Sequence, residues 1–259
     1  MAQSDSPVRP SRDPRRILVV LPAYNEEHRI GKLLDHIDVS MEEAALHYQA
    51  IVVDDGSRDS TAEIVAEKAA YMPILLKTHE KNMGLGATIR DGILAAAEIA
   101  RPRDIIVTMD ADDTHTPGLI LRMVRMIMEG CDVVIASRYQ PGARVIGVPF
   151  ARTLISYIGS WMFRLLFPIK GVKDFTCGYR AYRAEVIQDA AAQYGSQLFN
   201  QEGFQCMVDI LLKLRKLSFI FGEVPMILRY DQKEGASKMN VGMTIKRTLC
   251  LMLRSKLGK

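Results

Sequence analysis

The chain has 259 residues, of which 48% are hydrophobic and 25% charged, a composition typical of a soluble globular protein with a full core. Its formal net charge of +4 suits an anionic ligand or surface and does not require nucleic acid as a partner. The four cysteines form no C-x-x-C pair, so neither a zinc site nor a disulfide framework is predicted, and a reducing cytoplasm is the expected location.

The N-terminal residues 1–15 are polar and basic and lack the apolar segment of a secretory signal, so we expect a disordered leader. No run of eighteen apolar residues follows, and any contact with a membrane is therefore expected to be peripheral. Four apolar runs of strand length then alternate with segments whose apolar residues have helical spacing, and a fifth run follows. The strand runs are RILVVLPAY, YQAIVVDDGS, MPILLKTHE, RDIIVTMDAD and CDVVIASRY.

This alternation predicts an α/β fold with a mostly parallel sheet and helices on both faces. Asn25 is expected to cap the first helix. In such sheets ligands bind outside the carboxyl ends of the strands. The polar stretches PAYNE, DDGSRDS, HEKNMGLG, DADDTH and SRY each follow one strand. A single such loop is often only a turn, but five of them at one edge predict a ligand site.

Three carboxylates, Asp110, Asp112 and Asp113, follow the fourth strand directly in TMDADDTHTP. Like charges this close repel one another and resist burial unless a cation lies among them. The stretch therefore indicates a divalent metal.

The motifs PAYNEE, VVDDGSRDST, NMGLGATIRDGI, MDADDTHTP, SRY and DFTCGYRAYR together resemble family 2 glycosyltransferases of the dolichol-phosphate mannose synthase type. The resemblance runs from about Ile17 to Met239. It implies a GT-A fold, that is, a Rossmann-like nucleotide-sugar-binding domain over residues 16–240 with a single mixed sheet. It also implies a nucleotide-sugar donor, Mg²⁺ or Mn²⁺, and inversion at the sugar carbon.

By position in the family pattern, Asp110 and Asp112 are the metal carboxylates, and Asp110 also contacts the donor. Both are expected to be catalytic. The family often has Gln as a further ligand where this chain has Thr114. Asp113 either supports the metal ligands through a hydrogen bond or caps the helix that starts near Pro117.

The resemblance assigns Pro22, Tyr24 and Glu26 to the surroundings of the donor's base and ribose, and Asp54 or Asp55 can accept a hydrogen bond from a base edge. Gly84 to Gly86 are interpreted as a close approach of backbone rather than as a phosphate loop. The donor is GDP-mannose or UDP-glucose, and similarity to the mannose synthases favours mannose.

The acceptor side carries basic residues and only one carboxylate, Asp174. A hydroxyl acceptor needs a carboxylate base, whereas a phosphate with a second pKa of about 6 is already ionised. We therefore expect a polyprenyl (dolichyl) phosphate, with Asp174 orienting a cation or lining the sugar pocket. The residues that match the family's acceptor-phosphate positions are Arg138, Arg152 and Ser156, with Arg138 also catalytic.

Arg180 is interpreted as the partner of Asp174. Lys233, where the family often has Arg, is expected to act in catalysis by offsetting the donor's diphosphate charge, with Lys238 as the alternative.

Two segments predict attachment to an anionic membrane surface. Leu154 to Phe167 fits an interfacial helix that inserts Trp161, Phe163 and Phe167, and residues 241–259 form a basic amphipathic pattern. Anchoring through a separate membrane subunit or a homo-oligomer remains an alternative. A transferase acting on a soluble hydroxyl and a non-catalytic nucleotide-sugar-binding subunit are the rival functions.

Overall fold

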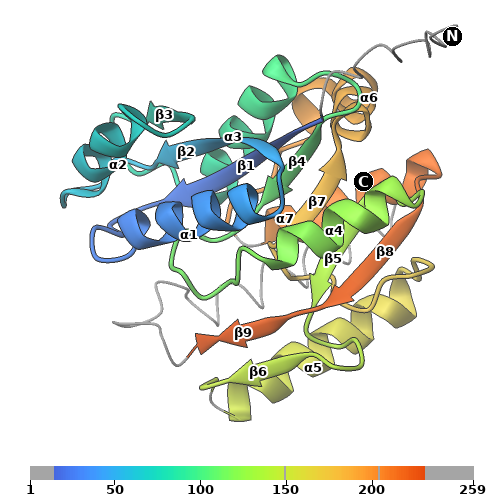
Figure 1. Ribbon diagram of the computed structural model, residues 1–259. Helices are drawn as coiled ribbons and strands as arrows, with labels where there is room; N and C mark the ends of the chain where they lie inside the picture. Colours follow the sequence, from blue (N-terminus) through green and yellow to red (C-terminus); the bar gives the residue numbers. More distant parts are fainter. Residues whose placement is uncertain (1–14, 149, 204, 231–259) are drawn as a thin grey trace, which may run out of the picture.

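The computed structural model describes residues 15–148, 150–203 and 205–230. Seven strands form one mixed sheet in the order β3-β2-β1-β4-β7-β5-β8, and all are parallel except β7, which runs antiparallel to β4 and β5 (Figure 1). The strands are β1 Arg16–Ala23, β2 His47–Asp54, β3 Ile74–Thr78, β4 Ile105–Thr108, β5 Val133–Ser137, β7 Arg180–Arg183 and β8 Phe221–Pro225. The predicted mixed, mostly parallel sheet is confirmed.

Helices cover both faces of this sheet. In the view of Figure 1, α1 and α4 lie in front, and α3, α6 and α7 lie behind. Their bounds are α1 Ile30–Glu43, α2 Thr61–Ala69, α3 Leu85–Ile99, α4 Leu119–Met128, α6 Ala184–Tyr194 and α7 Gln205–Leu214, with short 3-10 turns at Gly195–Gln197 and Arg215–Leu217. Because both faces are covered, β1 is apolar throughout after Arg16, and every residue from Ile17 to Leu21 is fully buried.

The first helix begins four residues later than the sequence suggested. Asn25 has a φ of 51° and precedes the helix, whose N-cap is Arg29, so the capping prediction is wrong. Asn25 instead occupies the left-handed conformation that asparagine tolerates, and its side-chain oxygen accepts a hydrogen bond from the Arg58 amide at 2.8 Å. The residue thus shapes the loop after β1 rather than the helix.

Arg180 lies fully buried on β7 and does not contact Asp174. Its two terminal nitrogens donate to the backbone oxygens of Met207 at 2.6 Å and Phe175 at 2.8 Å. The predicted pairing of Arg180 with Asp174 is therefore wrong. Arg180 ties the antiparallel strand to α7 and to the loop before β7, which the local sequence gave no reason to expect.

Beyond the carboxyl edge of the sheet lie α5, Phe150–Leu166, and a two-stranded parallel sheet of β6, Arg144–Ile146, and β9, Ile227–Arg229 (Figure 1). The helix α5 confirms the helical segment expected there. None of the helices in the described residues combines the length and hydropathy needed to cross a bilayer.

The inner face of α5 is part of the core. Phe163 is fully buried and stacks on Phe175 with ring centroids 5.4 Å apart, and Phe167 is also buried. The prediction that Phe163 and Phe167 enter a membrane interface is therefore wrong, whereas Trp161 is 55% exposed. The helical period explains the difference, because residues two apart lie on nearly opposite faces of a helix.

The order of the strands reverses between β1 and β4, so the loops after these two strands flank the crevice where ligands of such sheets bind. Close packing behind the crevice fixes its floor. A Cβ on Gly92 of α3 would collide with the side chain of Val20 on β1. The absence of a side chain at Gly92 therefore lets α3 pack closely against the sheet.

Candidate active site

The loops after β1 and β2 are braced against each other by side-chain hydroxyls. The amide of Asn25 donates to Ser57 Oγ at 2.9 Å, and Ser57 Oγ in turn donates to the Asp54 carboxylate. The amide of Glu26 donates to Thr61 Oγ1 at 2.8 Å. These bonds fix the backbone beside the half-buried Tyr24 before any ligand binds.

Asp55 ties the loop after β2 to the loop after β3. Its carboxylate accepts from the amides of Met83 at 2.7 Å and Gly84 at 2.9 Å, and it lies 2.7 Å from His79 Nδ1. A Cβ on Gly86 would collide with the backbone oxygen of Gln201, which confirms the close backbone approach expected at this loop. Asp54 and Asp55 are both buried and brace loops; base contact by either one stays a prediction.

His79 was not singled out from the sequence. Its Nε2 lies 3.1 Å from an oxygen of Asp91, so the ring spans two carboxylates. Burial acts to raise the pKa of Asp91, but the Arg90 guanidinium, aided by His79, outweighs it and holds that pKa below its ordinary value. Histidines between two carboxylates have no local sequence signature, since Asp55 and Asp91 are 36 positions apart.

The loop after β4 presents the two expected metal carboxylates in different settings. Asp110 is 42% exposed, whereas Asp112 is only 9% exposed. Thr114, which replaces the family's Gln, donates its hydroxyl to Asp112 Oδ1 at 2.7 Å. Thr114 therefore orients the carboxylate of Asp112.

Asp113 does not cap a helix. It has a φ of 55° and lies 3.4 Å from His36 Nδ1 on α1, and α4 begins only at Leu119, with Gly118 as N-cap and no side-chain cap. The capping alternative is wrong. The left-handed conformation at Asp113 turns the chain between Asp112 and Thr114.

His115 is a second residue that sequence reasoning missed. Its ring stacks on Tyr179 with centroids 4.9 Å apart, and its Nδ1 accepts from the Asp110 amide at 3.3 Å. The neutral ring then carries its proton on Nε2, which lies 3.9 Å from Asp110 Oδ2. The His115 ring therefore accepts a hydrogen bond from the Asp110 backbone and lies beside the Asp110 carboxylate.

The carboxylate oxygens of the loop after β4 fit Mg²⁺ or Mn²⁺ bound together with a diphosphate. Among the described residues, no group of three or more His, Cys, Asp or Glu side chains converges as a complete metal cage. Mg²⁺ is typically held by one or two carboxylates, with phosphate oxygens and water filling its other positions. Asp110 and Asp112 supply such a pair.

Among the residues predicted to face the acceptor, Arg138 and Asp174 form a bidentate ion pair. Arg138 Nε lies 2.8 Å from Asp174 Oδ2 and Nη2 lies 2.7 Å from Oδ1, while Nη2 also donates to Thr176 Oγ1 at 2.6 Å. Burial acts to raise the pKa of Asp174, but the Arg138 guanidinium and the surrounding hydrogen bonds hold that pKa below its ordinary value. Asp174 is therefore an ionised carboxylate with an engaged partner.

The predicted phosphate ligand Ser156 lies half-buried on α5. Its Oγ is 2.8 Å from the hydroxyl of Tyr139, whose ring lies under the Arg138 guanidinium at 5.5 Å. Tyr139 thus joins two predicted acceptor residues, although only its motif, SRY, had been recognised. Arg152 lies on α5 one turn before Ser156, and its side chain is outside the described part of the structure.

The strand β9 runs beside the loop after β4. The Arg229 amide donates to the Thr114 oxygen at 3.1 Å, and Leu228 forms a β-bridge with His115. The chain that carries Lys233 and Lys238 follows this strand. Both lysines, and the predicted helix at 241–259, lie outside the described residues.

Comparisons with known proteins agree with this arrangement. The model of the family described as "Glycosyl transferase family 2" matches residues 18–190. The chain is 30% identical to polyprenol monophosphomannose synthase of Mycolicibacterium smegmatis over 88% of its length and 83% of that protein. It is 31% identical to undecaprenyl-phosphate mannosyltransferase of Micrococcus luteus over 88% of its length and 89% of that protein. A dolichol-phosphate mannosyltransferase of Pyrococcus furiosus is 34% identical over 76% of the chain, which spans about half of that relative, 53%.

Solved structures of low sequence identity share the fold. Glucosyl-3-phosphoglycerate synthase from Mycobacterium tuberculosis, in complex with Mn²⁺, UDP and phosphoglyceric acid, has a TM-score of 0.66 at 19% identity. The match covers 94% of this chain and 79% of that one. The same enzyme with Mg²⁺ and UDP also has a TM-score of 0.66, with 94% and 80% covered. The predicted GT-A fold is confirmed.

Proposed function

Because the chain belongs to glycosyltransferase family 2, we propose that it is an inverting hexosyltransferase that moves mannose from GDP-mannose onto a polyprenyl phosphate. Two of the relatives are named as mannosyltransferases of dolichol phosphate and undecaprenyl phosphate, and the third as a polyprenol monophosphomannose synthase, which supports this choice of sugar and acceptor. UDP-glucose is the alternative donor.

The observation that carries the proposal is the state of Asp174. A hydroxyl acceptor must lose a proton as it attacks, so its enzyme needs a carboxylate that can take that proton. Asp174 is fully buried and therefore shielded from an acceptor hydroxyl, and both of its oxygens are engaged by Arg138. The net lowering of its pKa by Arg138 and the hydrogen bonds further weakens it as a base. A phosphate acceptor needs no base, because it is already ionised near neutral pH.

In this reaction an oxygen of the acceptor phosphate attacks the anomeric carbon of the sugar. The bond from that carbon to the nucleoside diphosphate breaks as the new carbon–oxygen bond forms on the opposite face, and the electron pair leaves with the diphosphate. A bound Mg²⁺ or Mn²⁺, held by Asp110 and Asp112, would offset the charge on the leaving group. Lys233 is proposed to contribute further positive charge there.

The chain's own residues position the two substrates. Pro22, Tyr24 and Glu26, with Asp54 or Asp55, are proposed to surround the nucleoside on the braced loops. Arg138, Arg152 and Ser156 are proposed to hold the acceptor phosphate, with the Tyr139 hydroxyl beside them. Arg138 serves this role through the part of its guanidinium that is not turned to Asp174, since its side chain is 21% exposed.

The experiment that tests the function is a panel of labelled GDP-mannose, UDP-glucose and other nucleotide sugars with a short polyprenyl phosphate in detergent, with and without Mn²⁺. Label that extracts into organic solvent only with GDP-mannose and the lipid phosphate is the expected result. Label transferred only to water-soluble sugars would favour a hydroxyl acceptor. Donor binding without transfer to any acceptor would favour a non-catalytic subunit.

We also propose that the protein works at the cytoplasmic face of a membrane as a peripheral protein. Residues 16–240 form the proposed transferase domain and residues 241–259 a basic membrane-associated helix. The exposed Trp161 on α5 supports this proposal. A separate membrane subunit or a homo-oligomer stays an alternative means of attachment.

A further inference from the structure

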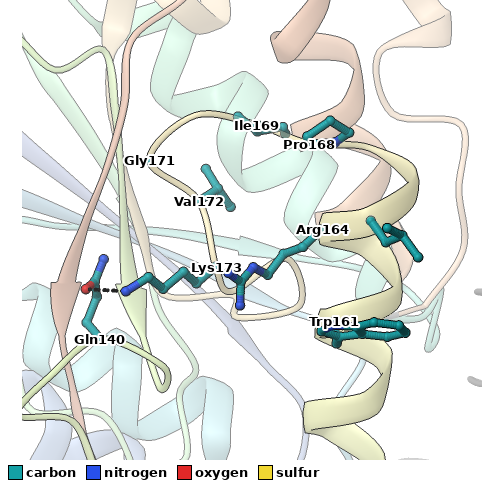
Figure 2. A pocket seen from close by; sticks show the side chains of 9 residues that line it. Gln140, Trp161, Arg164, Pro168, Ile169, Gly171, Val172 and Lys173 are labelled. Carbon is teal, nitrogen blue, oxygen red and sulfur yellow. Dashed lines mark hydrogen bonds between the residues drawn. The ribbon is translucent and has the colours of Figure 1, made fainter.

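A pocket lies between the C-terminal half of α5 and the loop that follows it. It adjoins the predicted acceptor residues in sequence, since Gln140 follows Tyr139 and Lys173 precedes Asp174, but none of the candidate site residues lines it. Its volume is about 450 Å³, within the range of about 300–1,000 Å³ common for small-molecule sites. Figure 2 shows Trp161 and Arg164 projecting from α5, and Lys173 reaching across to Gln140. Apolar walls are provided by Leu165, Pro168, Ile169 and Val172.

Two cations line this pocket. Lys173 Nζ donates to the amide oxygen of Gln140 at 3.2 Å, and within the described part of the chain neither Lys173 nor Arg164 forms an ion pair with a carboxylate. Glu223, which contacts the Lys173 backbone, is engaged elsewhere, because its oxygens accept from the Lys173 and Asp174 amides and from the Gln140 amide nitrogen. Two like charges beside one cavity favour an anion between them.

The backbone around Lys173 is held in place. Ser160 on α5 donates its hydroxyl to the Lys173 oxygen, and the Lys173 amide donates to Glu223 on β8 at 2.6 Å. Gly171 has a φ of 87°, and a Cβ there would collide with the Phe221 oxygen. The loop is therefore shaped by contacts with α5 and β8 and does not need a ligand to form the pocket.

The surroundings of the pocket match an anionic bilayer. From Val133 to Lys173 the 41 residues include six Lys and Arg and no Asp or Glu. The outer face of α5 exposes Tyr157, Ile158, Trp161 and Leu165, which recur at helical spacing. A surface with exposed large apolar side chains beside unopposed cations is typical of a helix that lies in the lipid headgroup region.

We propose that this pocket binds the phosphate of an anionic phospholipid, with Arg164 and Lys173 as its ligands and Trp161 and Leu165 set among the adjacent acyl chains. The inference deepens the proposed membrane attachment and rests on it. The C-terminal residues 231–259 are a less suitable occupant, because they contain seven Lys and Arg against two acidic residues and are repelled by the same cations. A second copy would bring the same positive segment onto itself.

Trp161 is the only tryptophan, so its fluorescence reports directly on this pocket. The full chain is titrated with vesicles of phosphatidylglycerol and phosphatidylcholine, with vesicles of phosphatidylcholine alone, and with inorganic phosphate. The expected result is a saturable blue shift with the anionic vesicles only. Each cation near anionic lipid is worth about 1 kcal/mol, or about fivefold in affinity, so Arg164→Gln with Lys173→Gln should weaken binding about 25-fold.

The matched control removes two exposed cations elsewhere, Lys32→Gln with Lys77→Gln, and should change vesicle affinity less than twofold. An equal loss of vesicle affinity in this control would contradict a specific site at the pocket and favour non-specific electrostatic attraction of the protein to the vesicle. A blue shift caused by inorganic phosphate would overturn the lipid as ligand. A blue shift that grows with protein concentration in the absence of lipid would mean that a second copy of the chain covers Trp161. Emission already typical of buried tryptophan in lipid-free protein would mean that another part of the same chain covers it.

Failure of this inference is separable from failure of the proposed function. Transfer to a short polyprenyl phosphate in detergent micelles does not need a phospholipid, so the Arg164→Gln, Lys173→Gln protein should keep that activity while losing vesicle binding. Loss of both together would mean that the two residues act at the acceptor site, which would also overturn the pocket as a separate site.

Discussion

Arg138 and Asp174 face each other as a fork and a carboxylate, with two nitrogen–oxygen distances of 2.8 and 2.7 Å, and the Arg138 amide also donates to Asp174 at 3.0 Å. The pair joins the end of β5 to the loop before β7, beside the candidate acceptor residues. Because Asp174 is fully buried, each partner depends on the other for its charge to be tolerated. Two roles therefore have to be separated for this pair, one in stabilising the fold and one in catalysis.

Replacing Asp174 with Asn separates the stabilising role from the catalytic role. The change leaves Arg138 without its counter-charge, so urea unfolding should show a loss of about 3–5 kcal/mol in the free energy of unfolding. Adding Arg138→Gln should restore part of that loss, as expected for a coupled pair. Unchanged stability together with a loss of transfer of more than about 10³-fold would instead identify Asp174 as a catalytic base and contradict the phosphate acceptor.

The lowered pKa of Asp174 has a consequence for acid stability. A carboxylate whose pKa is lower in the folded than in the unfolded protein contributes stability above the unfolded value, about 3.9 for Asp, and loses it as pH falls towards the folded value. Below about pH 4, the wild-type free energy of unfolding should therefore fall more steeply with pH than that of Asp174→Asn. Parallel slopes from urea titrations at several pH values would contradict this assignment.

The loop after β4 contains two neighbouring aspartates, Asp112 and Asp113, that can be compared directly. Asp112→Asn should abolish transfer at saturating donor and weaken Mn²⁺ binding in calorimetry with GDP present, because it removes a metal carboxylate. Asp113→Asn should keep both within about threefold, since Asp113 faces His36 on α1. Full activity of Asp112→Asn, or of wild type in excess chelator, would exclude the metal reading.

Tyr139 gives a cleaner test of the acceptor side than Arg138, because its hydroxyl can be removed without unpairing a buried charge. In Tyr139→Phe, the loss of a hydrogen bond worth about 1 kcal/mol to Ser156 should raise the KM for polyprenyl phosphate about fivefold. Slow hydrolysis of the donor by water should be unchanged. An equal fall in both reactions would place Tyr139 on the donor side.

The strands and the carboxyl-edge loops were predictable because their signals are local. Buried parallel strands are apolar throughout, and the polar residues begin where each strand ends, so RILVVLPAY and the loop after it identify both. The pairing of Arg138 with Asp174 was not predictable, because it joins positions 36 apart across an antiparallel strand inserted into the sheet. Arg180 looked equally suitable in sequence, and only the path of β7 decides that it turns inwards to Met207.

The two faces of α5 show the same limit at the scale of one helix. The segment was correctly predicted to be a helix, but large apolar residues occur on both of its sides, so sequence alone did not say which side meets the core. The packing of Phe163 on Phe175 decides it, and the exposed side is that of Trp161.

This division gives a final prediction, in which two aromatic residues of α5 respond in opposite ways to the same change. Phe163→Ser should lower the free energy of unfolding by about 3–5 kcal/mol or more, the range typical of truncating a buried phenylalanine, because the stack with Phe175 is lost and a polar group is buried. Trp161→Ser should leave the urea midpoint nearly unchanged, since Trp161 is 55% exposed, yet reduce co-sedimentation with anionic vesicles at low salt. If Trp161→Ser sediments as well as wild type, α5 does not enter the headgroup region, and attachment through a membrane subunit becomes the better account.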